Sequence, residues 1–242
     1  MMPDRGMRLV TWNVWWRFGD DWERRQPAIA TTLRDLRPDV VGLQETWAEQ
    51  VDRLGSELGM HAAEVETTIP PPPDHELGVG LLSRWPIAAV EERLLPAAHR
   101  PPPPAMLATI EHPSGPLRVI VACTEWEPEL ADDHLAQTTA LARLGADVLL
   151  ADLNAPPGSP LLAPFDGAMT DAYEAGGGDP DAATLPSSLP IAPLEARHLL
   201  DRRIDHIMVS DGLTPQRAFV AGGPVDGVQP SDHYPVVADV AR

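Results

Sequence analysis

Short apolar runs that stop abruptly at polar residues recur along the chain. Runs of this kind, when turn residues bound them, are typical of buried β-strands. The runs that we expect to be strands span residues 7–13, 39–46, 77–87, 87–95, 105–110, 117–124, 147–152, 201–210 and 236–240. Asn13, Glu45 and Asp152 come at the end of three of these runs, so the pattern places polar side chains at strand ends.

Segments with apolar residues three or four positions apart predict helices. They span residues 20–36, 48–58 and 132–145. Pro38 lies just beyond the first helix and Gly59 closes the second, and both residues are typical stop signals. Residues 155–197 are rich in proline, glycine, serine and alanine, and we expect a long loop there with a short helical segment at 160–165.

The predicted strands outnumber the helices, and several strands follow one another without a helix between them. This order favours an α/β or α+β sandwich over a doubly wound parallel sheet. Two proline runs, at 70–73 and 101–104, are interpreted as surface loops because strands of similar character flank both. With 242 residues the chain is long enough for a large core, and we expect one domain spanning residues 1–242.

The net charge of the chain limits the classes of molecule that it is expected to bind. The formal net charge is −18, and all 18 basic residues are arginines. The sequence has no basic stripe to neutralise the phosphates of a long nucleic acid, so we do not expect DNA or RNA as a partner. A divalent metal and a few local arginines can offset the repulsion for a small phosphoester.

The single cysteine, Cys123, excludes an internal disulfide and fits a reducing compartment. It follows an apolar run, and we expect it in the core. The first residues contain no apolar signal core, and no later segment has the apolar length that a membrane span needs. We therefore expect a soluble, cytoplasmic protein without a membrane span.

The apolar run 147–152 ends in Asp152, and Asn154 follows two positions later. Residues two apart on a strand point to the same face, and a carboxylate beside an amide suits a metal-bound phosphate. The alternative is structural, with Asp152 capping the loop and Asn154 forming an Asx turn. The rest of the chain decides between the two interpretations.

Other polar residues at or beside strand ends are Asn13, Glu45, Asp205, Asp232 and His233. Each has a structural alternative; Asp205, for example, has Arg202 and Arg203 nearby as ion partners. In combination, the carboxylates of Glu45, Asp152 and Asp232 suit a hard divalent cation such as Mg²⁺ or Mn²⁺. Such a cation holds a phosphoryl oxygen, lowers the pKa of a water and stabilises an oxyanion leaving group.

Six short motifs occur in order across almost the whole chain. They are Thr11-Trp12-Asn13-Val14, Gln44-Glu45-Thr46, the segment 80–87 with Ser83-Arg84-Trp85-Pro86, Ala151-Asp152-Leu153-Asn154, Arg203-Ile204-Asp205 and Ser231-Asp232-His233. In this combination the sequence resembles the endonuclease/exonuclease/phosphatase family, which is related to DNase I. The resemblance implies a four-layer α/β sandwich, in which two packed mixed β-sheets are flanked by helices.

The resemblance also implies in-line hydrolysis of a phosphoester by a metal-activated water. In this pattern Glu45 is the principal metal ligand, with Mg²⁺ or Mn²⁺ as the cofactor. Asn13 contacts the metal or the phosphate, and Asp232 completes the metal site.

The other matching positions imply the remaining roles. Asp152 orients or deprotonates the attacking water, and Asn154 holds the phosphate. His233 contacts the scissile phosphate and acts in acid–base chemistry, while Asp205 fixes the tautomer of that histidine.

One position departs from the pattern. Many family members have a histidine directly after the strand that ends here at Thr124, and this chain has Glu125. A carboxylate offers neither a proton nor positive charge to a phosphate unless its pKa is raised. Glu125 is therefore either an additional metal ligand or a sign of lost function.

Three functions remain open. The first is a divalent-metal-dependent phosphoester hydrolase, a phosphodiesterase or phosphatase, that acts on a small nucleotide, sugar, inositol or lipid-derived phosphoester. The second is a DNA or RNA endonuclease or exonuclease of the same family, which the acidic charge argues against. The third is a catalytically inactive binding module that keeps the fold, and only Glu125 supports it.

Overall fold

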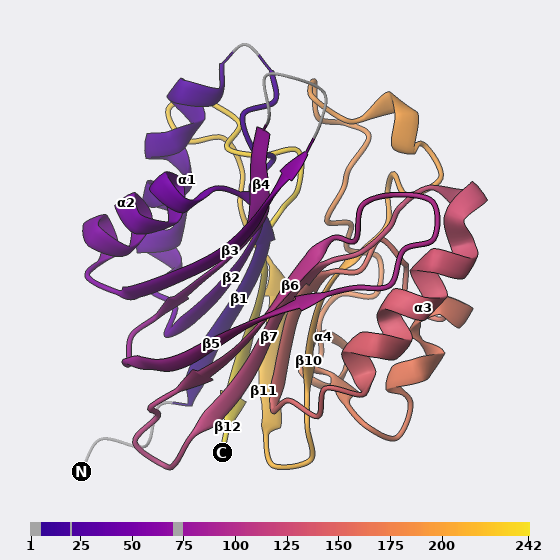
Figure 1. Cartoon of the computed structure of the whole chain (residues 1–242). Helices are drawn as coiled ribbons and strands as arrows, with labels where there is room; N and C mark the ends of the chain where they lie inside the picture. Colours follow the sequence, from indigo (N-terminus) through magenta and orange to yellow (C-terminus); the bar gives the residue numbers. More distant parts are fainter. Residues whose placement is uncertain (1–5, 20, 70–74) are drawn as a thin grey trace.

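Two β-sheets of six strands each lie face to face, with helices on their outer sides (Figure 1). The computed structural model describes residues 6–19, 21–69 and 75–242. Both sheets are mixed, because each contains one parallel pair of strands among antiparallel pairs. The four-layer sandwich predicted from the sequence is confirmed.

The first sheet has the strand order β11-β12-β1-β2-β4-β3. Its strands are β1 (Met7–Asn13), β2 (Val40–Thr46), β3 (His61–Ile69), β4 (His75–Ser83), β11 (Thr214–Val220) and β12 (Val236–Ala241). β1 and β2 are parallel, with Asn13 opposite Gln44. Their carboxyl ends, and therefore Asn13 and Glu45, lie at the same edge of the sheet.

The second sheet has the strand order β5-β6-β7-β8-β10-β9. Its strands are β5 (Ile87–Leu94), β6 (Pro104–Ile110), β7 (Leu117–Cys123), β8 (Val148–Asp152), β9 (Thr170–Asp171) and β10 (Asp205–Val209). β7 and β8 are parallel, with Cys123 opposite Asp152. β10 runs antiparallel to β8, so its first residue, Asp205, also lies opposite Asp152.

Helices cover the outer faces of the two sheets. The helical segments are α1 (Trp22–Leu36), α2 (Ala48–Leu58), α3 (Ala131–Ala142) and α4 (Ala172–Ala175), with 3₁₀ turns η1 (Pro128–Leu130), η2 (Pro160–Phe165) and η3 (Leu194–Ala196). α1 buries Ile29 and Leu33 in one cluster with Trp12 of β1. On the second sheet, Leu141 of α3 packs in a cluster with Leu149 of β8. These contacts hold the outer layers against the strands that carry the polar ends.

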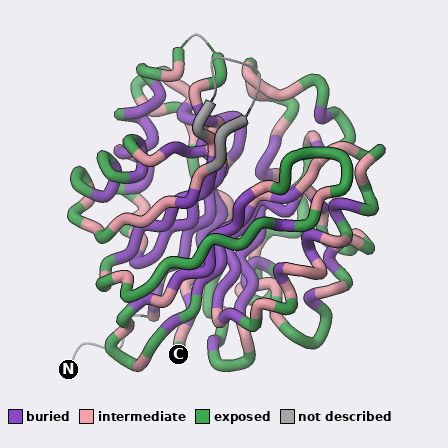
Figure 2. Tube along the Cα trace, in the orientation of Figure 1, coloured by how far each residue is buried: buried purple, intermediate pink, exposed green. Residues whose placement is uncertain are grey.

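The main core lies between the sheets, where Leu9 and Leu81 of the first sheet meet Val121 and Leu150 of the second. Buried residues accordingly concentrate in the strands (Figure 2). Gly42 of β2 marks a close approach, because a Cβ there would lie 2.5 Å from the Cβ of Leu150. Real carbon atoms do not pack at that distance, so glycine at this position lets the sheets pack closely.

Most of the predicted elements are confirmed, with differences at the edges. β5 forms as expected, but Val90 and Leu94 are exposed by 40% and 61%, since β5 is an edge strand (Figure 2). β10 begins at Asp205 instead of residue 201. The sequence did not predict β3, β9 or β11, which have weaker apolar alternation. The expected loop at residues 70–73 lies outside the described residues.

Within the described part of the chain, no helix combines the length and the hydrophobicity needed to cross a lipid bilayer.

Candidate functional site

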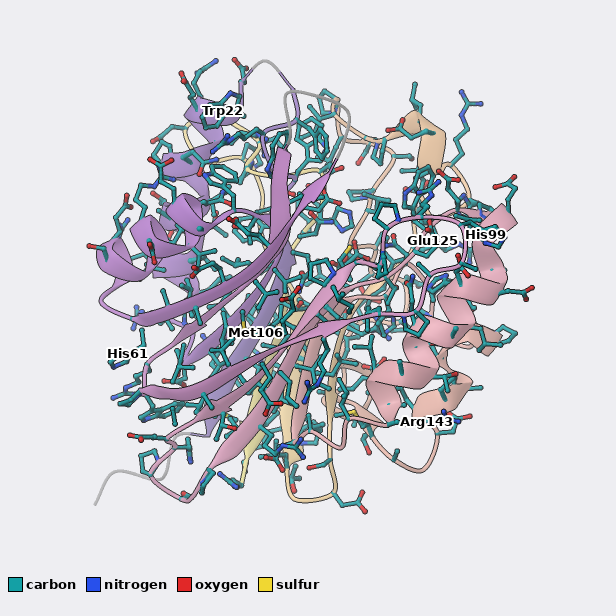
Figure 3. The ribbon with its side chains drawn as sticks, viewed as in Figure 1. Trp22, His61, His99, Met106, Glu125 and Arg143 are labelled. Atoms are coloured by element: carbon teal, nitrogen blue, oxygen red, sulfur yellow. The ribbon has the colours of Figure 1, made fainter. Side chains whose placement is uncertain are left out.

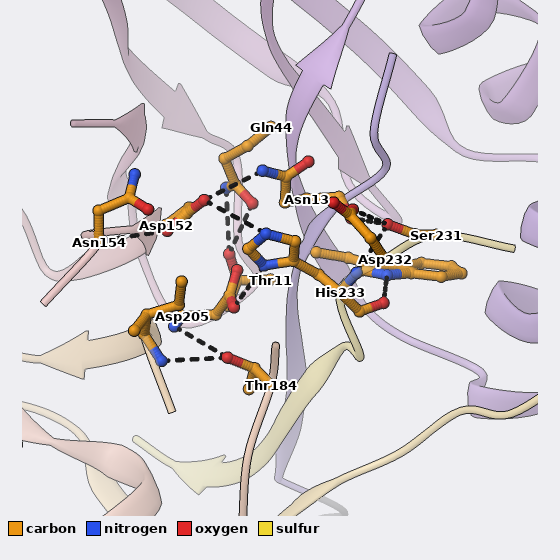
Figure 4. Close-up of polar contacts among 12 residues, drawn as sticks. Thr11, Asn13, Gln44, Asp152, Asn154, Thr184, Asp205, Ser231, Asp232 and His233 are labelled. Carbon is orange, nitrogen blue, oxygen red and sulfur yellow. Dashed lines mark hydrogen bonds and ion pairs between the residues drawn. The ribbon is translucent and has the colours of Figure 1, made fainter. Parts of the chain in front are cut away.

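The strand ends described above bring one cluster of polar side chains together where the two sheets meet (Figure 4). Asn13 is buried at the end of β1, and its Nδ2 donates to Glu45 Oε1 at 2.9 Å and to Asp152 Oδ2 at 3.0 Å. Its Oδ1 accepts a hydrogen bond from the backbone N–H of Trp15 at 2.9 Å. Asn13 therefore bridges a carboxylate of the first sheet and one of the second.

Glu45 owes its position to an irregularity in β2. The pairing of β2 with β4 shifts register between Gln44 and Thr46, and Glu45 has a positive φ of 51°. A positive φ is uncommon for a residue other than glycine and costs free energy. The bulge separates the Glu45 side chain from the regular alternation of β2 and directs it to Asn13.

Asp152 lies at the centre of the cluster and is 1% exposed. Its Oδ1 accepts from the backbone N–H of Asn154 at 3.1 Å, and its Oδ2 lies 3.9 Å from Nε2 of His233. Asn154 has a positive φ of 47°, and its Nδ2 donates to the carbonyl oxygen of Thr124 at 2.9 Å. Both predicted residues are in the cluster, with an Asx-type bond between them.

Asp205 and His233 form a close buried pair. His233 Nδ1 lies 2.9 Å from Asp205 Oδ2, which leaves Nε2 facing Asp152. The carbonyl oxygen of His233 accepts from Trp12 Nε1 at 2.9 Å, and Thr184 Oγ1 accepts from the backbone N–H of Asp205 at 3.4 Å. Asp205 thus holds the histidine ring, while Trp12 and Thr184 hold the backbone of His233 and of Asp205.

Ser231 organises the turn that carries Asp232 and His233. Its Oγ donates to the carbonyl oxygen of Asn13 at 2.7 Å and accepts from the backbone N–H of His233 at 3.1 Å. The same hydroxyl lies 3.3 Å from Asp232 Oδ1. Because Ser231 binds the end of β1, the turn before β12 is fixed beside Asn13.

The carboxylates of the cluster repel one another and have lost most of their contact with water. Burial, together with the charge of Asp205, raises the pKa of Asp152 to about 7. Burial and the charge of Glu45 raise the pKa of Asp232 to about 7. Burial likewise raises the pKa of Glu45. Burial opposes the charged form of His233, but the carboxylates of Asp205, Asp152 and Asp232 together outweigh it and raise the pKa of that imidazole well above its usual range.

This arrangement suits a hard divalent cation. Ligand atoms of Glu45, Cys123 and Asp152 lie within 4.8 Å of one another, as do those of Asp152, Asp205 and His233. Asp205 Oδ1 is buried and, within the described part of the chain, has no hydrogen-bond partner. A bound cation would offset the repulsion among these buried carboxylates, and oxygen donors favour Mg²⁺ or Mn²⁺.

Cys123 and Arg203 differ from their sequence-based interpretations. Cys123 is half-buried at the cluster instead of lying within the core, and its Sγ is 3.9 Å from Asp152 Oδ2. Arg203 does not pair with Asp205. It binds Asp171 at 2.8 Å and Glu174 at 3.4 Å.

Glu125 lies in the loop after β7, and its carboxylate binds groups of that loop (Figure 3). Its Oε1 accepts from the backbone N–H groups of Trp126 and Glu127 at 2.8 and 2.9 Å and lies 3.7 Å from Arg100 NH1. It is in neither of the two metal-competent groups found among the described residues. In this structure the carboxylate caps its own loop.

The sequence analysis missed Trp12, Thr184 and Arg25. Arg25 of α1 is 2% exposed and donates to the carbonyl oxygens of Val14, Trp15, Trp16, Phe18 and Pro230. Trp12 was interpreted only as a strand residue, and Thr184 lies in a loop without a pattern. An arginine among apolar helix positions was the one available signal for Arg25.

Comparison with known proteins agrees with this geometry. Residues 10–233 match the family model of the Endonuclease/Exonuclease/phosphatase family. The chain belongs to this family. Endonucleases, exonucleases and phosphatases all break phosphoester bonds. No curated protein sequence matches the chain.

Solved structures of the family have the same fold. An endonuclease/exonuclease/phosphatase from Beutenbergia cavernae matches with a TM-score of 0.76 and 22% identity, over 98% of this chain and 72% of that chain. A mannosyl-6-phosphatase from Bacteroides thetaiotaomicron matches with a TM-score of 0.73 and 16% identity, over 98% and 100%. A humanized TDP2 from D. rerio matches with a TM-score of 0.79 and 16% identity, over 98% and 100%. At sequence identities this low, the structural similarity establishes the fold of the chain and not its substrate.

Proposed function

We propose that this protein is a divalent-metal-dependent phosphoester hydrolase that acts on a small substrate. The observation that carries the proposal is the buried cluster in which Asn13 joins Glu45 to Asp152 while His233 faces the same aspartate. The mannosyl-6-phosphatase among the structural neighbours supports a small phosphoester as substrate. The net charge of −18 argues against a long nucleic acid, and the free cysteine supports a reducing, cytoplasmic setting.

Glu45 would hold Mg²⁺ or Mn²⁺, with Asn13 beside it. Asp232 is in neither metal-competent group of the described residues, but the charge of Glu45 acts on it, and it would complete the metal site. When bound, the cation neutralises the phosphate and stabilises the negative charge that develops on the phosphoryl and leaving oxygens. The Nδ2 group of Asn13 already binds both Glu45 and Asp152, so Asn13 also sets the separation of the two carboxylates.

Asp152 is placed to orient the attacking water and accept its proton. A base acts best with a pKa near the working pH, and burial brings the pKa of Asp152 to about 7. Asn154 donates one amide hydrogen to Thr124 and keeps the second for a phosphate oxygen. As the water oxygen bonds to phosphorus, the opposite phosphorus–oxygen bond breaks, and the leaving alkoxide takes a proton from solvent and departs as the alcohol.

His233 would contact the scissile phosphate through Nε2. Asp205 binds Nδ1 at 2.9 Å, which fixes the ring orientation and favours the charged imidazolium. A cationic Nε2–H donates to the phosphate and stabilises the extra charge of the transition state.

The test is hydrolysis of bis- and mono-p-nitrophenyl phosphate with Mg²⁺, with Mn²⁺ and with EDTA. We expect turnover that EDTA abolishes, and His233→Ala should lower kcat by about 10²–10⁴-fold. His61→Ala is the matched control, because His61 is an exposed histidine at the start of β3, away from the labelled Glu125 (Figure 3). The preferred ester distinguishes a diesterase from a monoesterase. Absence of turnover together with absence of Mg²⁺ binding by calorimetry would make the proposal wrong.

A further inference from the structure

A cavity of about 360 Å³ opens beside the cluster, between the two sheets. One wall belongs to the first sheet and its loops, and the other belongs to the loops at the same end of the second sheet. The lining residues are Phe18, Glu45, residues 77–79, Ala97, residues 100–104, residues 123–126 and Gln137. Because Glu45 belongs to both the cavity and the cluster, a molecule whose phosphate lies at the cluster extends directly into this space.

The lining is largely apolar. The proline run at 101–104, interpreted from the sequence as a surface loop, forms one wall, and Leu77, Ala97 and Trp126 add further carbon surface. Phe18 lies at the cavity with 44% of its surface exposed. The indole of Trp126 stacks on His198 with ring centroids 6.4 Å apart, which limits its rotation. Exposed apolar side chains gathered around a cavity mark a binding site.

The charges of the cavity exclude a second anionic group. Arg100 is the only cation among the described lining residues, and it pairs with both Glu125 and Glu127. With Glu45 included, these side chains carry an excess of negative charge. An additional phosphate or carboxylate in the cavity would have to displace an existing ion pair and approach two carboxylates.

From these observations we infer that the cavity binds the organic group of the phosphoester, and that this group is uncharged and apolar, either aromatic or branched alkyl. The inference rests on the proposed function and adds to it the class of substrate. A volume of about 360 Å³ is at the lower end of the range for small-molecule sites, and it admits a ring with substituents. The cavity thereby selects among phosphoesters by the group attached to the phosphate.

The test is calorimetric binding of phosphonates, which the enzyme does not hydrolyse, to the full chain in Mg²⁺. The probes are methylphosphonate, phenylphosphonate and 4-carboxyphenylphosphonate. We expect phenylphosphonate to bind about tenfold or more tightly than methylphosphonate, since burial of a ring removes apolar surface from water. The carboxylated ring should lose most of this advantage because of the negative lining.

Two variants test whether the preference for the phenyl group arises in the cavity. Phe18→Ser and Trp126→Ser should each reduce the preference for the phenyl group to about threefold or less and leave the Kd of methylphosphonate unchanged. Leu135→Ser is the matched control, because Leu135 has a similar exposed fraction of 43% and lies outside the cavity lining.

The outcomes separate the two proposals. Equal binding of the methyl and phenyl compounds, or an unchanged preference in both cavity variants, overturns the inference and leaves the proposed function standing. Tighter binding of the carboxylated ring than of phenylphosphonate also overturns it, since the cavity would then accept an anion. Failure of all three phosphonates to bind in Mg²⁺ overturns the inference, while hydrolysis of the nitrophenyl esters and Mg²⁺ binding decide separately whether the proposed function stands.

Discussion

Two aspartate–histidine pairs lie close together in the chain and differ in their surroundings. Asp205 binds His233 at 2.9 Å, whereas Asp171 lies 3.3 Å from His206 and is also bound by Arg203 at 2.8 Å. His206 and Arg203 lower the pKa of Asp171 despite its burial. Among the described residues, Asp205 forms an ion pair with His233, and its charge contributes to the raised pKa of that imidazole.

Replacement of Asp205 tests how the charge of this carboxylate acts on His233. Asp205→Asn should lower the pKa of His233, since only the charges of Asp152 and Asp232, among the groups that raise this pKa, then oppose burial. We expect kcat to fall by about 10²-fold or more, because Nε2 loses its positive charge and its fixed tautomer. The pKa is measured by nuclear magnetic resonance on ¹³C-labelled histidine, and kcat with the preferred nitrophenyl ester.

The second pair supplies the control for that substitution. Asp171→Asn also removes a carboxylate from a histidine in the same sheet, but Asp171 is in neither metal-competent group among the described residues. It should reduce stability, because Arg203 is buried and loses a partner, while the pKa of His233 and kcat stay near wild type. An equal loss of kcat in both variants would show that Asp205 acts through folding alone.

At the level of elements, the loops beside the cluster depend on one side chain of α1. Arg25 reaches from the helix to the loop after β1 and to Pro230, just before the turn with Asp232. Burial lowers its pKa to about 10, which still leaves it charged at neutral pH. One guanidinium therefore satisfies carbonyl groups of two loops that come from opposite ends of the sequence.

Loss of this side chain should disorder both loops. We expect Arg25→Ala to lower the free energy of unfolding by about 3 kcal/mol or more, since buried carbonyl groups lose their donors. Arg24→Ala is the control: Arg24 is exposed and forms a 3.4 Å surface ion pair with Asp21, and such surface pairs contribute about 0–1 kcal/mol. Urea denaturation measures both. A similar, small change in the two variants would contradict the role assigned to Arg25.

The elements that the sequence predicted well are those with a strong apolar signal. β1, β2 and β8 are apolar runs closed by Asn13, the Gln44-Glu45 pair and Asp152, so both the strands and their polar ends could be predicted. β11 was missed because only Ala218 of its residues is buried, and an edge strand need not alternate. Thr184 and Trp12 could not be assigned, because their partners Asp205 and His233 are brought to them only by the folded chain.

At the scale of the whole molecule, the two sheets bring together buried carboxylates, and the charged forms of these groups oppose folding. Asp152 belongs to the second sheet, and Asp232 lies in the loop before a strand of the first. In the metal-free protein each has a pKa of about 7, against an ordinary value of 3.8. A carboxyl group with a raised folded-state pKa stabilises the fold below its unfolded-state pKa, and this contribution is lost as the pH rises through the folded-state value.

A bound cation should therefore stabilise the fold more at alkaline than at acidic pH. We expect the increase in Tm caused by Mg²⁺, relative to EDTA, to be larger at about pH 8, where both carboxylates are charged, than at about pH 5.5, where protons compete with the metal. Differential scanning calorimetry measures Tm in Mg²⁺ and in EDTA at each pH. The difference between the two Tm values removes the effect of groups that titrate in the same way in both solutions. Asp232→Asn should reduce the increase and its dependence on pH, whereas Asp211→Asn, in an exposed turn after β10, should change neither. An increase of the same size at both pH values would show that these carboxylates do not exchange protons for metal.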